Sequence, residues 1–419
     1  MARRRDPSTR APREPFPRGF WVIWSTVVVD MIGFGIAIPV LGPFARTTFA
    51  ASGLMVGAIG SAFSLAQFVA APLLGRLSDR IGRKPVIVVS LIGTAIASLI
   101  TGLAGSAWVL VAARAFDGAS GATIGVAQAA VSDIVVPRRR AQALGMIGAA
   151  FGIGFTVGPA IGALAAWIGD RRTPFYVAAA IAAANAIAAI VRIQETKGVV
   201  MEPEGVAPTT DAGLAQTWRD NGLPTLIVVS AISMFAFSAF EQTFSIFGQD
   251  RIGFTESTAG IAFVVVGIVV SVVQGGLVGP AVRSLGEARL LRVGLALTAV
   301  GLAVLSLSRG WWLLVPALVL LSAGQGFASP TMSSSLANRI HPDRRGEVLG
   351  VSQSWGSLAR VFGPLAGGAA FDHVAVAAPF VGGAVLFGLC LLLLKWVRAT
   401  DTLLGSSSAP DKNRAFARS

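Results

Sequence analysis

Long apolar runs, separated by short polar stretches, occupy most of the chain. A run of about twenty apolar residues is long enough to cross a lipid bilayer as a helix. The run at 347–369 is the most polar of them, because it contains Glu347, Gln353 and Arg360. The pattern predicts an all-α membrane protein with twelve transmembrane helices. The expected spans are 20–41, 54–74, 86–105, 107–130, 142–166, 174–193, 223–246, 258–278, 289–306, 311–335, 347–369 and 376–396.

The two halves of the chain repeat one another. "PRRRAQALG" at 137–145 matches "PDRRGEVLG" at 342–350, and Gly158-Pro159 maps to Gly363-Pro364 at the same offset of 205. A duplicated six-span unit places a substrate cavity between its two copies. We therefore expect two pseudo-symmetric six-helix bundles. The predicted divisions are an N-terminal tail at 1–19, a bundle at 20–193, a linker at 194–222, a bundle at 223–396 and a C-terminal tail at 397–419.

Composition and charge agree with this architecture. The chain of 419 residues is 54% hydrophobic and 13% charged, whereas soluble domains carry about a quarter charged residues. Its net charge of +13 is unevenly placed: 27 Lys and Arg lie on the side of the termini and 5 on the other. Cytoplasmic loops carry such an excess. The charge therefore predicts cytoplasmic termini in a cell membrane, and it does not point to nucleic acid.

The residues of common enzyme sites are scarce. The single cysteine, Cys390, lies in an apolar run, and the two histidines, His341 and His373, fall in polar connections. Thiolate metal sites and disulfides are therefore not expected. We predict no enzymatic activity, no metal and no cofactor, and a membrane enzyme or receptor is a remote alternative.

One polar segment stands out between the second and third spans. "GRLSDRIGRKP" at 75–85 contains Asp79, which a loop serving only membrane orientation does not require. Gly75 and Gly82 would permit tight backbone geometry and close approach of helices.

This segment resembles the signature loop of the major facilitator superfamily, G-x-L-S-D-R-x-G-R-K. "RAFDGASGA" at 114–122 and "GAAFGIGFTVGPAIG" at 148–162 resemble further motifs of proton-driven drug antiporters, and "IQETK" at 193–197 is similar to tetracycline exporters. The resemblance implies a twelve-span antiporter that works by alternating access, with the substrate cavity between the two bundles. It also implies a gating role for Gly75, Asp79, Arg80, Gly82, Arg83, Asp133, Gly158 and Pro159, with Arg83 paired to Asp133.

The chain departs from tetracycline exporters at four positions. Ala97 and Thr298 stand where those proteins carry acids, Asp117 replaces a glutamine of the fourth-span motif, and Glu241 is an additional acid. These differences argue against tetracycline itself as the substrate. They leave the drug-antiporter class in place.

Glycines recur at intervals of four in the fifth span. Gly148 and Gly152 form one set, and Gly154, Gly158 and Gly162 form another. Small residues at this spacing share a helix face and let a neighbouring backbone approach closely. The spacing predicts tight packing at both sets, and the resemblance adds a gating role on the outer side.

Five charged residues lie well inside predicted spans, away from their ends: Asp30, Arg114, Asp117, Glu241 and Arg360. Asp or Arg at a bilayer centre costs roughly 2.5–3.5 kcal/mol to insert, so a purely structural helix would avoid them. Arg114 and Asp117 are three positions apart and could neutralise each other. Asp30 has no basic residue in its span, so it needs a partner elsewhere or a proton. We predict proton coupling through Asp30, Arg114 and Asp117.

A mostly apolar cavity is expected between the bundles. Its candidate linings are "SMFAFSAFEQTF" at 233–244 and "FSLAQF" at 63–68. Phenylalanine faces attract flat or cationic ligands, and Glu241 could pair with an amine. The alternative is that these phenylalanines face lipid. The predicted cavity residues are Gln67, Phe237, Glu241 and Arg360.

These features together predict proton-coupled export of amphipathic compounds, with cations favoured, as in drug efflux and antibiotic resistance. Proton-coupled import, or uniport, of a small metabolite stays open as an alternative. The expected partners are a small-molecule substrate, protons and the lipid bilayer, and we expect a monomer.

Overall fold

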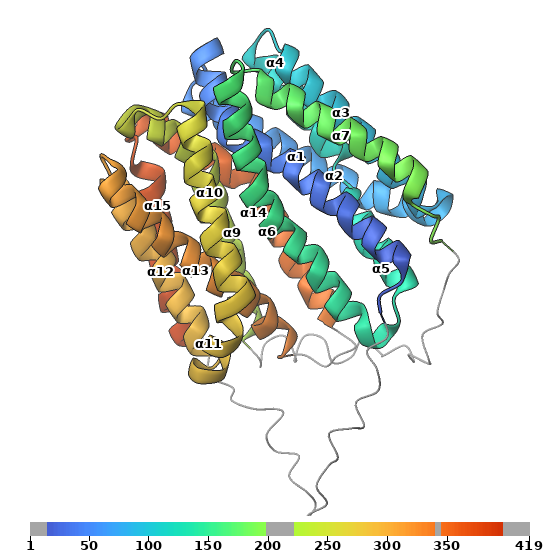
Figure 1. The fold of residues 1–419 in the computed structure, drawn as a ribbon. Coiled ribbons are helices and arrows are strands. Elements are labelled where there is room, and N and C mark those ends of the chain that lie inside the picture. Colours follow the sequence, from blue (N-terminus) through green and yellow to red (C-terminus); the bar gives the residue numbers. More distant parts are fainter. Residues whose placement is uncertain (1–14, 198–221, 340–344, 397–419) are drawn as a thin grey trace, which may run out of the picture.

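The computed structural model describes residues 15–197, 222–339 and 345–396, and within these ranges it contains helices and no strand (Figure 1). The N-terminal half contains α1 (Arg18–Phe49), α2 (Gly53–Ile81), α3 (Arg83–Leu103), α4 (Ala107–Ser120), α5 (Thr123–Ile134), α6 (Pro137–Ile168) and α7 (Thr173–Arg192). The C-terminal half contains α9 (Leu223–Ile252), α10 (Glu256–Val272), the π-helical turn η3 (Val273–Leu277), α11 (Val278–Leu285), α12 (Glu287–Leu307), α13 (Trp311–Ala337), α14 (Arg345–His373) and α15 (Ala378–Trp396).

The all-α membrane architecture predicted from the apolar runs is confirmed. Eleven helical segments in the described part of the chain are long and apolar enough to cross a membrane. The remaining expected span corresponds to α14, which is 29 residues long. Its length suffices for a bilayer, but it is more polar than the others, so its crossing stays a prediction.

The fourth expected span, 107–130, is not one continuous helix. It divides into α4 and α5 at Gly121, whose carbonyl oxygen accepts a hydrogen bond from Nε2 of Gln67 at 3.0 Å. Just before the break, a Cβ added to Gly118 would overlap the backbone of Phe63 in α2. Contacts with α2 therefore accompany the interruption, and the apolar pattern alone could not reveal it.

Tight turns join α2 to α3 and α11 to α12, so the two helices of each pair run in opposite directions. Gly82 ends α2 with φ of 108°, and Gly286 ends α11 with φ of 76°. Both angles lie in the region that favours glycine. The two turns occupy corresponding positions of the repeat, which supports the pseudo-symmetry.

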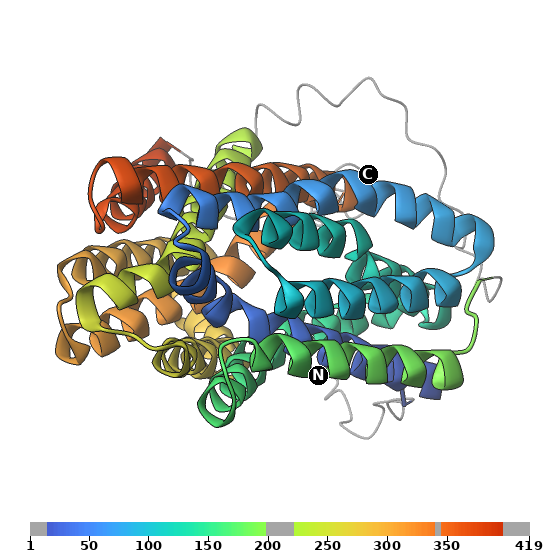
Figure 2. The ribbon, with the colours of Figure 1, turned by 90° about the horizontal axis from the view of Figure 1, so that it is seen from above.

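We call the end of the molecule at which α1 begins the terminal end, and the opposite end the distal end. Two helix pairs provide most of the contact between the halves, α2 with α14 and α6 with α10. Figure 2 shows α2 and α14 side by side. Because α2 corresponds to α10 and α14 to α6 in the repeat, these pairs are equivalent contacts.

Candidate functional site

The two halves pack closely at the distal end. A Cβ added to Gly57 in α2 would overlap the carbonyl oxygen of Pro364 in α14. In the equivalent pair, a Cβ at Gly260 of α10 would lie 2.9 Å from the carbonyl oxygen of Pro159 in α6. Such distances leave no room for a side chain, so backbone packs on backbone and the cavity is closed at this end.

Polar contacts reinforce the closed distal end. The carboxylate of Asp372 in α14 accepts hydrogen bonds from the backbone N–H groups of Gly53 and Leu54, both at 2.7 Å. These N–H groups begin α2, where a negative charge is favoured by the helix dipole. Arg46 in α1 forms an ion pair with Asp250 in α9 at 2.9 Å. We call these contacts of Arg46, Asp250 and Asp372 the distal latch.

Two further hydrogen bonds join the halves nearer to the middle of the helices. Nε2 of Gln242 donates to the carbonyl oxygen of Val56 at 3.0 Å. Oγ of Ser61 donates to the carbonyl oxygen of Val361 at 2.6 Å. The closed region therefore extends well into the α2–α14 pair.

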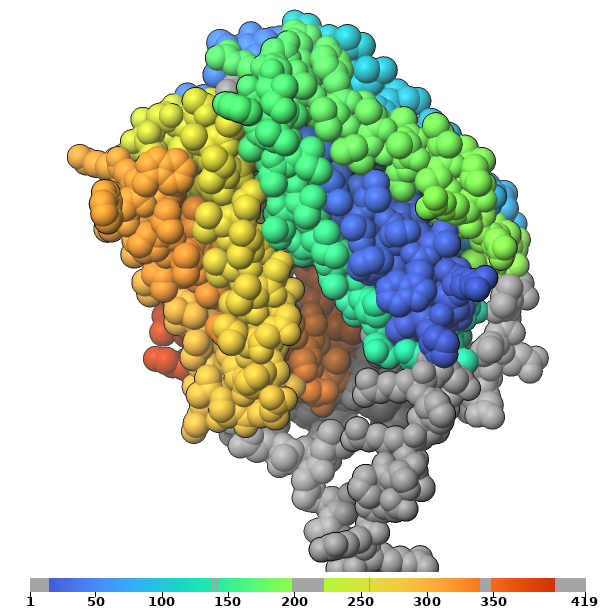
Figure 3. Space-filling model, in the orientation of Figure 1, coloured from blue at the N-terminus to red at the C-terminus, as the bar shows by residue number. Residues whose placement is uncertain are grey.

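The halves separate toward the terminal end. Figure 3 shows a hollow between α6 and α10 that widens toward the bottom of the view. An added Cβ at Gly145 of α6, or at Gly275 and Gly276 of η3, would have no neighbour within 4 Å. The cavity between the halves is therefore open at the terminal end and closed at the distal end.

Two sequence predictions about close packing are wrong in this conformation. An added Cβ at Gly75 or Gly148 would have no neighbour within 4 Å. Both glycines lie in parts of α2 and α6 nearer to the terminal end, where the halves have separated. The spacing of small residues shows which face they share, but it does not show whether a partner covers that face.

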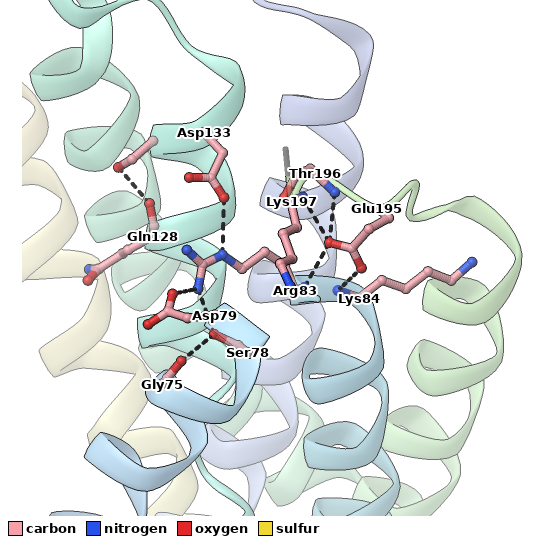
Figure 4. A network of polar contacts seen from close by, with 11 residues as sticks. Gly75, Ser78, Asp79, Arg83, Lys84, Gln128, Asp133, Glu195, Thr196 and Lys197 are labelled. Carbon is pink, nitrogen blue, oxygen red and sulfur yellow. Dashed lines mark hydrogen bonds and ion pairs between the residues drawn. The ribbon is translucent and has the colours of Figure 1, made fainter. Parts of the chain in front are cut away.

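The signature loop forms a polar network with the ends of α5 and α7 (Figure 4). Arg83 pairs with Asp133 at 3.0 Å, as the resemblance implied, and with Asp79 at 2.5 Å. Its Nη1 also donates to Oγ of Ser78 at 2.7 Å. The side chain of Asp79 is 62% exposed. Arg83 therefore ties the loop to α5, whereas Asp79 faces solvent on one side.

Glu195, after the end of α7, holds the start of α3. Its carboxylate accepts the backbone N–H groups of Arg83 at 2.8 Å and Lys84 at 3.1 Å, together with two from its own segment. Partial burial acts to raise the pKa of Glu195, but these four donors outweigh it and lower the pKa below its ordinary value. Nζ of Lys197 donates to the carbonyl oxygen of Arg80, which adds a second link to the loop.

Gly82 is required at this junction for two reasons. Its φ of 108° is one that other residues rarely adopt, and an added Cβ would overlap Oε2 of Glu195. Both the backbone conformation and the close approach of Glu195 therefore favour glycine at position 82, as the sequence predicted.

A second charged group lies inside the N-terminal half. Arg114 and Asp117 form an ion pair at 2.5 Å. Their spacing of three residues had indicated that the two charges could neutralise each other. They line a small cavity together with Asp30 and Gln67. The cavity has a volume of about 50 Å³, enough for a water molecule or two. Asp30 is buried and electrostatically close to Asp117.

Arg114 is held by its surroundings. Its guanidinium lies over the ring of Phe63 at 4.4 Å, and its Nε is buried without a hydrogen-bond partner. The N-terminal half thus brings Asp30, Arg114 and Asp117 together, the same three residues that the sequence assigned to proton coupling. Gln67, assigned to the substrate cavity, lies in this group as well.

A third charged group lies across the cavity in the C-terminal half. Glu241 in α9 is half-buried and interacts electrostatically with Arg360 of α14 and with Arg114 of the other half. Phe237, one turn away from Glu241, is half-buried and packs against Phe240 with ring centroids 5.7 Å apart. The predicted cavity residues Phe237, Glu241 and Arg360 therefore gather in one region.

The glycines of the fifth-span motif lie mainly against their own half. A Cβ added to Gly158 would lie 2.6 Å from Cα of Gly35 in α1. In contrast, the carbonyl of Pro159 lies beside Gly260 of the other half. Gly158 therefore packs α6 on α1, and Pro159 lies at the closed contact between the halves.

The sequence predicted no partner for Arg46, Asp250, Asp372, Gln242 or Glu195, although "IQETK" contains Glu195 and the cavity lining at 233–244 contains Gln242. Their partners in other helices are more than 100 positions away. For Arg46, Asp250 and Asp372, the available signal was a charged residue next to the end of a span. Among the described residues, no group of His, Cys, Asp and Glu has the arrangement of a metal site.

Comparison with known proteins finds a matching family model and similar resistance proteins. The family model of the Major Facilitator Superfamily matches residues 23–283 and 275–417. The chain is 31% identical over 393 residues to the class C tetracycline resistance protein of Escherichia coli, covering 91% of this chain and 98% of that protein. It is 28% identical to multidrug resistance protein 2 of Bacillus subtilis, covering 90% and 94%.

Two solved structures of transporters have a fold similar to that of this chain. The human organic anion transporter MFSD10 (TETRAN) aligns with a TM-score of 0.65 and 26% identity, covering 90% of this chain and all of that one. The nucleoside transporter NupG aligns with a TM-score of 0.72 and 14% identity, covering 90% and 98%, which supports the fold alone. With twelve expected spans in two related halves around a cavity closed at one end, the chain belongs to the major facilitator superfamily of transporters.

Proposed function

We propose that this transporter exports amphipathic compounds in exchange for protons. The observation that carries the proposal is the group formed by Asp30, Arg114 and Asp117 around a small cavity within the membrane-spanning part of the N-terminal half. Ionisable residues in that position are costly and mark substrate or proton pathways. The similarity to tetracycline and multidrug resistance proteins supports drug export as the direction.

Asp30 is the proposed proton carrier. Arg114 is already paired with Asp117 at 2.5 Å, so it does not fully compensate a charge on Asp30. A carboxyl group here can change between a neutral and an ionised form as its neighbours and the water around it change. A cavity of about 50 Å³ leaves room for water to deliver the proton.

The orientation that the basic loops indicate fits export as the direction. If the termini are cytoplasmic, this conformation is open to the cytoplasm and closed outward by the distal latch. A compound would enter from the cytoplasm or the inner leaflet. Return of one proton down a 100 mV potential releases about 2.3 kcal/mol, which supports a substrate gradient of about fifty-fold.

Transport by the purified full-length protein in vesicles tests this proposal. With an imposed pH gradient, we expect the wild type to accumulate an amphipathic dye against its concentration gradient. Asp30→Asn should abolish accumulation and keep exchange of labelled dye between equal concentrations, because exchange needs no proton. Accumulation by Asp30→Asn equal to that of the wild type would show that Asp30 is not the carrier.

A matched acid provides the control. Asp170 lies in the distal turn between α6 and α7, where it caps that turn by accepting N–H groups of Arg172 and Thr173. Asparagine is an equally good cap, so Asp170→Asn should leave accumulation unchanged. Equal loss in both variants would indicate a general effect of removing an acid.

A further inference from the structure

Arg360 presents an unpaired guanidinium to the central cavity. Its side chain is accessible in the middle of α14, one residue before the carbonyl of Val361 that binds Ser61 of the other half. Among the described residues it forms no ion pair, and its one hydrogen bond runs from Nε to Sδ of Met234 at 3.4 Å. Both terminal nitrogens are therefore free to bind a ligand.

The facing side of α9 carries an apolar stripe that ends in an acid. Met234, Phe237 and Glu241 recur at intervals of three and four, so they lie on one face of the helix. Met234 contacts Arg360, and Glu241 interacts with it electrostatically without forming a direct ion pair. Met234 and Glu241 are about 10 Å apart along the helix, with Phe237 between them.

We propose that this site selects amphipathic compounds that carry an anionic and a cationic group on one aromatic or aliphatic body. Arg360 would bind the anionic group, Glu241 the cationic group, and Phe237 the body between them. The inference rests on the proposed export function and specifies its substrate class as zwitterionic compounds.

The charges of the site favour this class over simple cations. Glu241 alone would attract a cation, but Arg360 in the same cavity repels one and would be left without a counterion. A guanidinium offers parallel N–H donors that match a carboxylate or a similar planar anion. Because the two charges do not pair directly, a ligand that bridges them neutralises both without first breaking an ion pair.

Arg114 does not compete for the anionic group. It is paired with Asp117 at 2.5 Å, and its guanidinium lies against Phe63. Arg360 therefore has a different role from the arginine of the N-terminal half. A variant at Arg360 should alter ligand selection and leave the proposed proton group intact.

Binding of a matched ligand series tests the proposal. Four naphthyl compounds of similar size, carrying an ammonium, a carboxylate, both groups or neither, are titrated into the purified full-length protein in detergent without a proton gradient. The wild type should bind the zwitterion most tightly. Arg360→Gln should weaken the carboxylate-bearing compounds about tenfold or more, and leave the neutral compound unchanged. Glu241→Gln should weaken the ammonium-bearing compounds by a similar factor.

Two control variants separate charge from geometry and folding. Arg360→Lys keeps the charge and loses the paired donors, so it should retain part of the affinity for carboxylates. Arg309→Gln removes an exposed arginine from the distal end and should change nothing. Equal loss for all four compounds in Arg360→Gln, or a wild type that binds the zwitterion no better than the neutral compound, would overturn the proposal.

This test does not depend on proton coupling. Asp30→Asn should show the same ligand preference as the wild type, because Asp30 interacts with Asp117 and Thr123 and contacts neither Arg360 nor Glu241. If the preference holds and accumulation does not respond to a pH gradient, the proposed export mechanism fails and the assignment of Arg360 stands.

Discussion

Glu195 illustrates how one side chain can connect separate parts of the fold. Its carboxylate binds the first backbone N–H groups of α3 and also closes the segment that follows α7. The loop at 75–85 was recognisable from the sequence, because its residues are unusual between apolar spans. The partner of its backbone was not recognisable, because Glu195 lies 112 positions from Arg83 and only folding brings them together.

Replacing Glu195 should lower stability in a pH-dependent way. Losing a carboxylate that caps a helix costs about 1 kcal/mol, so Glu195→Gln should melt at a lower temperature than the wild type in detergent. The pKa of Glu195 is lower in the folded protein than in the unfolded chain. The stabilisation by its carboxylate is therefore fully present above the ordinary carboxyl pKa of about 4.3. It is lost as the pH falls through the lowered pKa of the folded protein. The difference in melting temperature should therefore shrink in acid.

Gln194→Ala is the matched control for this measurement, since Gln194 is exposed and adjacent. Its melting temperature should match that of the wild type at each pH. A difference between Glu195→Gln and the wild type that stays constant down to strongly acidic pH would contradict the proposed role of the carboxylate.

At the scale of elements, α6 shows both the value and the limit of the sequence pattern. The spacing of Gly154, Gly158 and Gly162 correctly predicted a face on which another backbone packs, and that backbone is α1. The same reasoning failed at Gly148, because close approach depends on whether a partner lies opposite. Whether the halves are joined or separated at a given level is a property of the conformation.

The two positions provide a paired prediction. In Gly158→Ala the new methyl group would lie 2.6 Å from Cα of Gly35, so α1 and α6 must move apart. Overpacking of this kind costs typically 1–3 kcal/mol, and we expect a lower melting temperature and reduced transport. Gly148→Ala meets open space and gains helix propensity, so its melting temperature should be equal or higher. Equal destabilisation of both variants would contradict the assignment of the packed face.

At the scale of the whole molecule, α2 and α14 run side by side and carry a carboxylate at each end of the pair. In this conformation Asp372 of α14 caps the start of α2 at the distal end. Asp79, near the end of α2, pairs with Arg83 at the terminal end, where the cavity is open. The resemblance implied a gating role for Asp79, and we propose that Asp79 lies beneath α14 when the cavity opens outward. The two acids would then stabilise opposite conformations of the same transporter.

Opposite shifts in the conformational equilibrium are therefore expected for Asp372→Asn and Asp79→Asn. A carboxylate at a helix N-terminus contributes about 1 kcal/mol, so each change should alter the ratio of the two conformations about fivefold.

Spin labels measure this ratio in a protein whose Cys390 is replaced by alanine. Labels at Thr48 and Arg309 report the width of the distal end, and labels at Arg192 and Arg289 report the width of the terminal end. Asp372→Asn should increase the population with a long distal distance, and Asp79→Asn the population with a long terminal distance. Asp170→Asn, outside both contacts, should change neither distribution. If both variants shift the populations in the same direction, the two carboxylates do not act on opposite conformations, and alternating access must depend on other contacts between the halves.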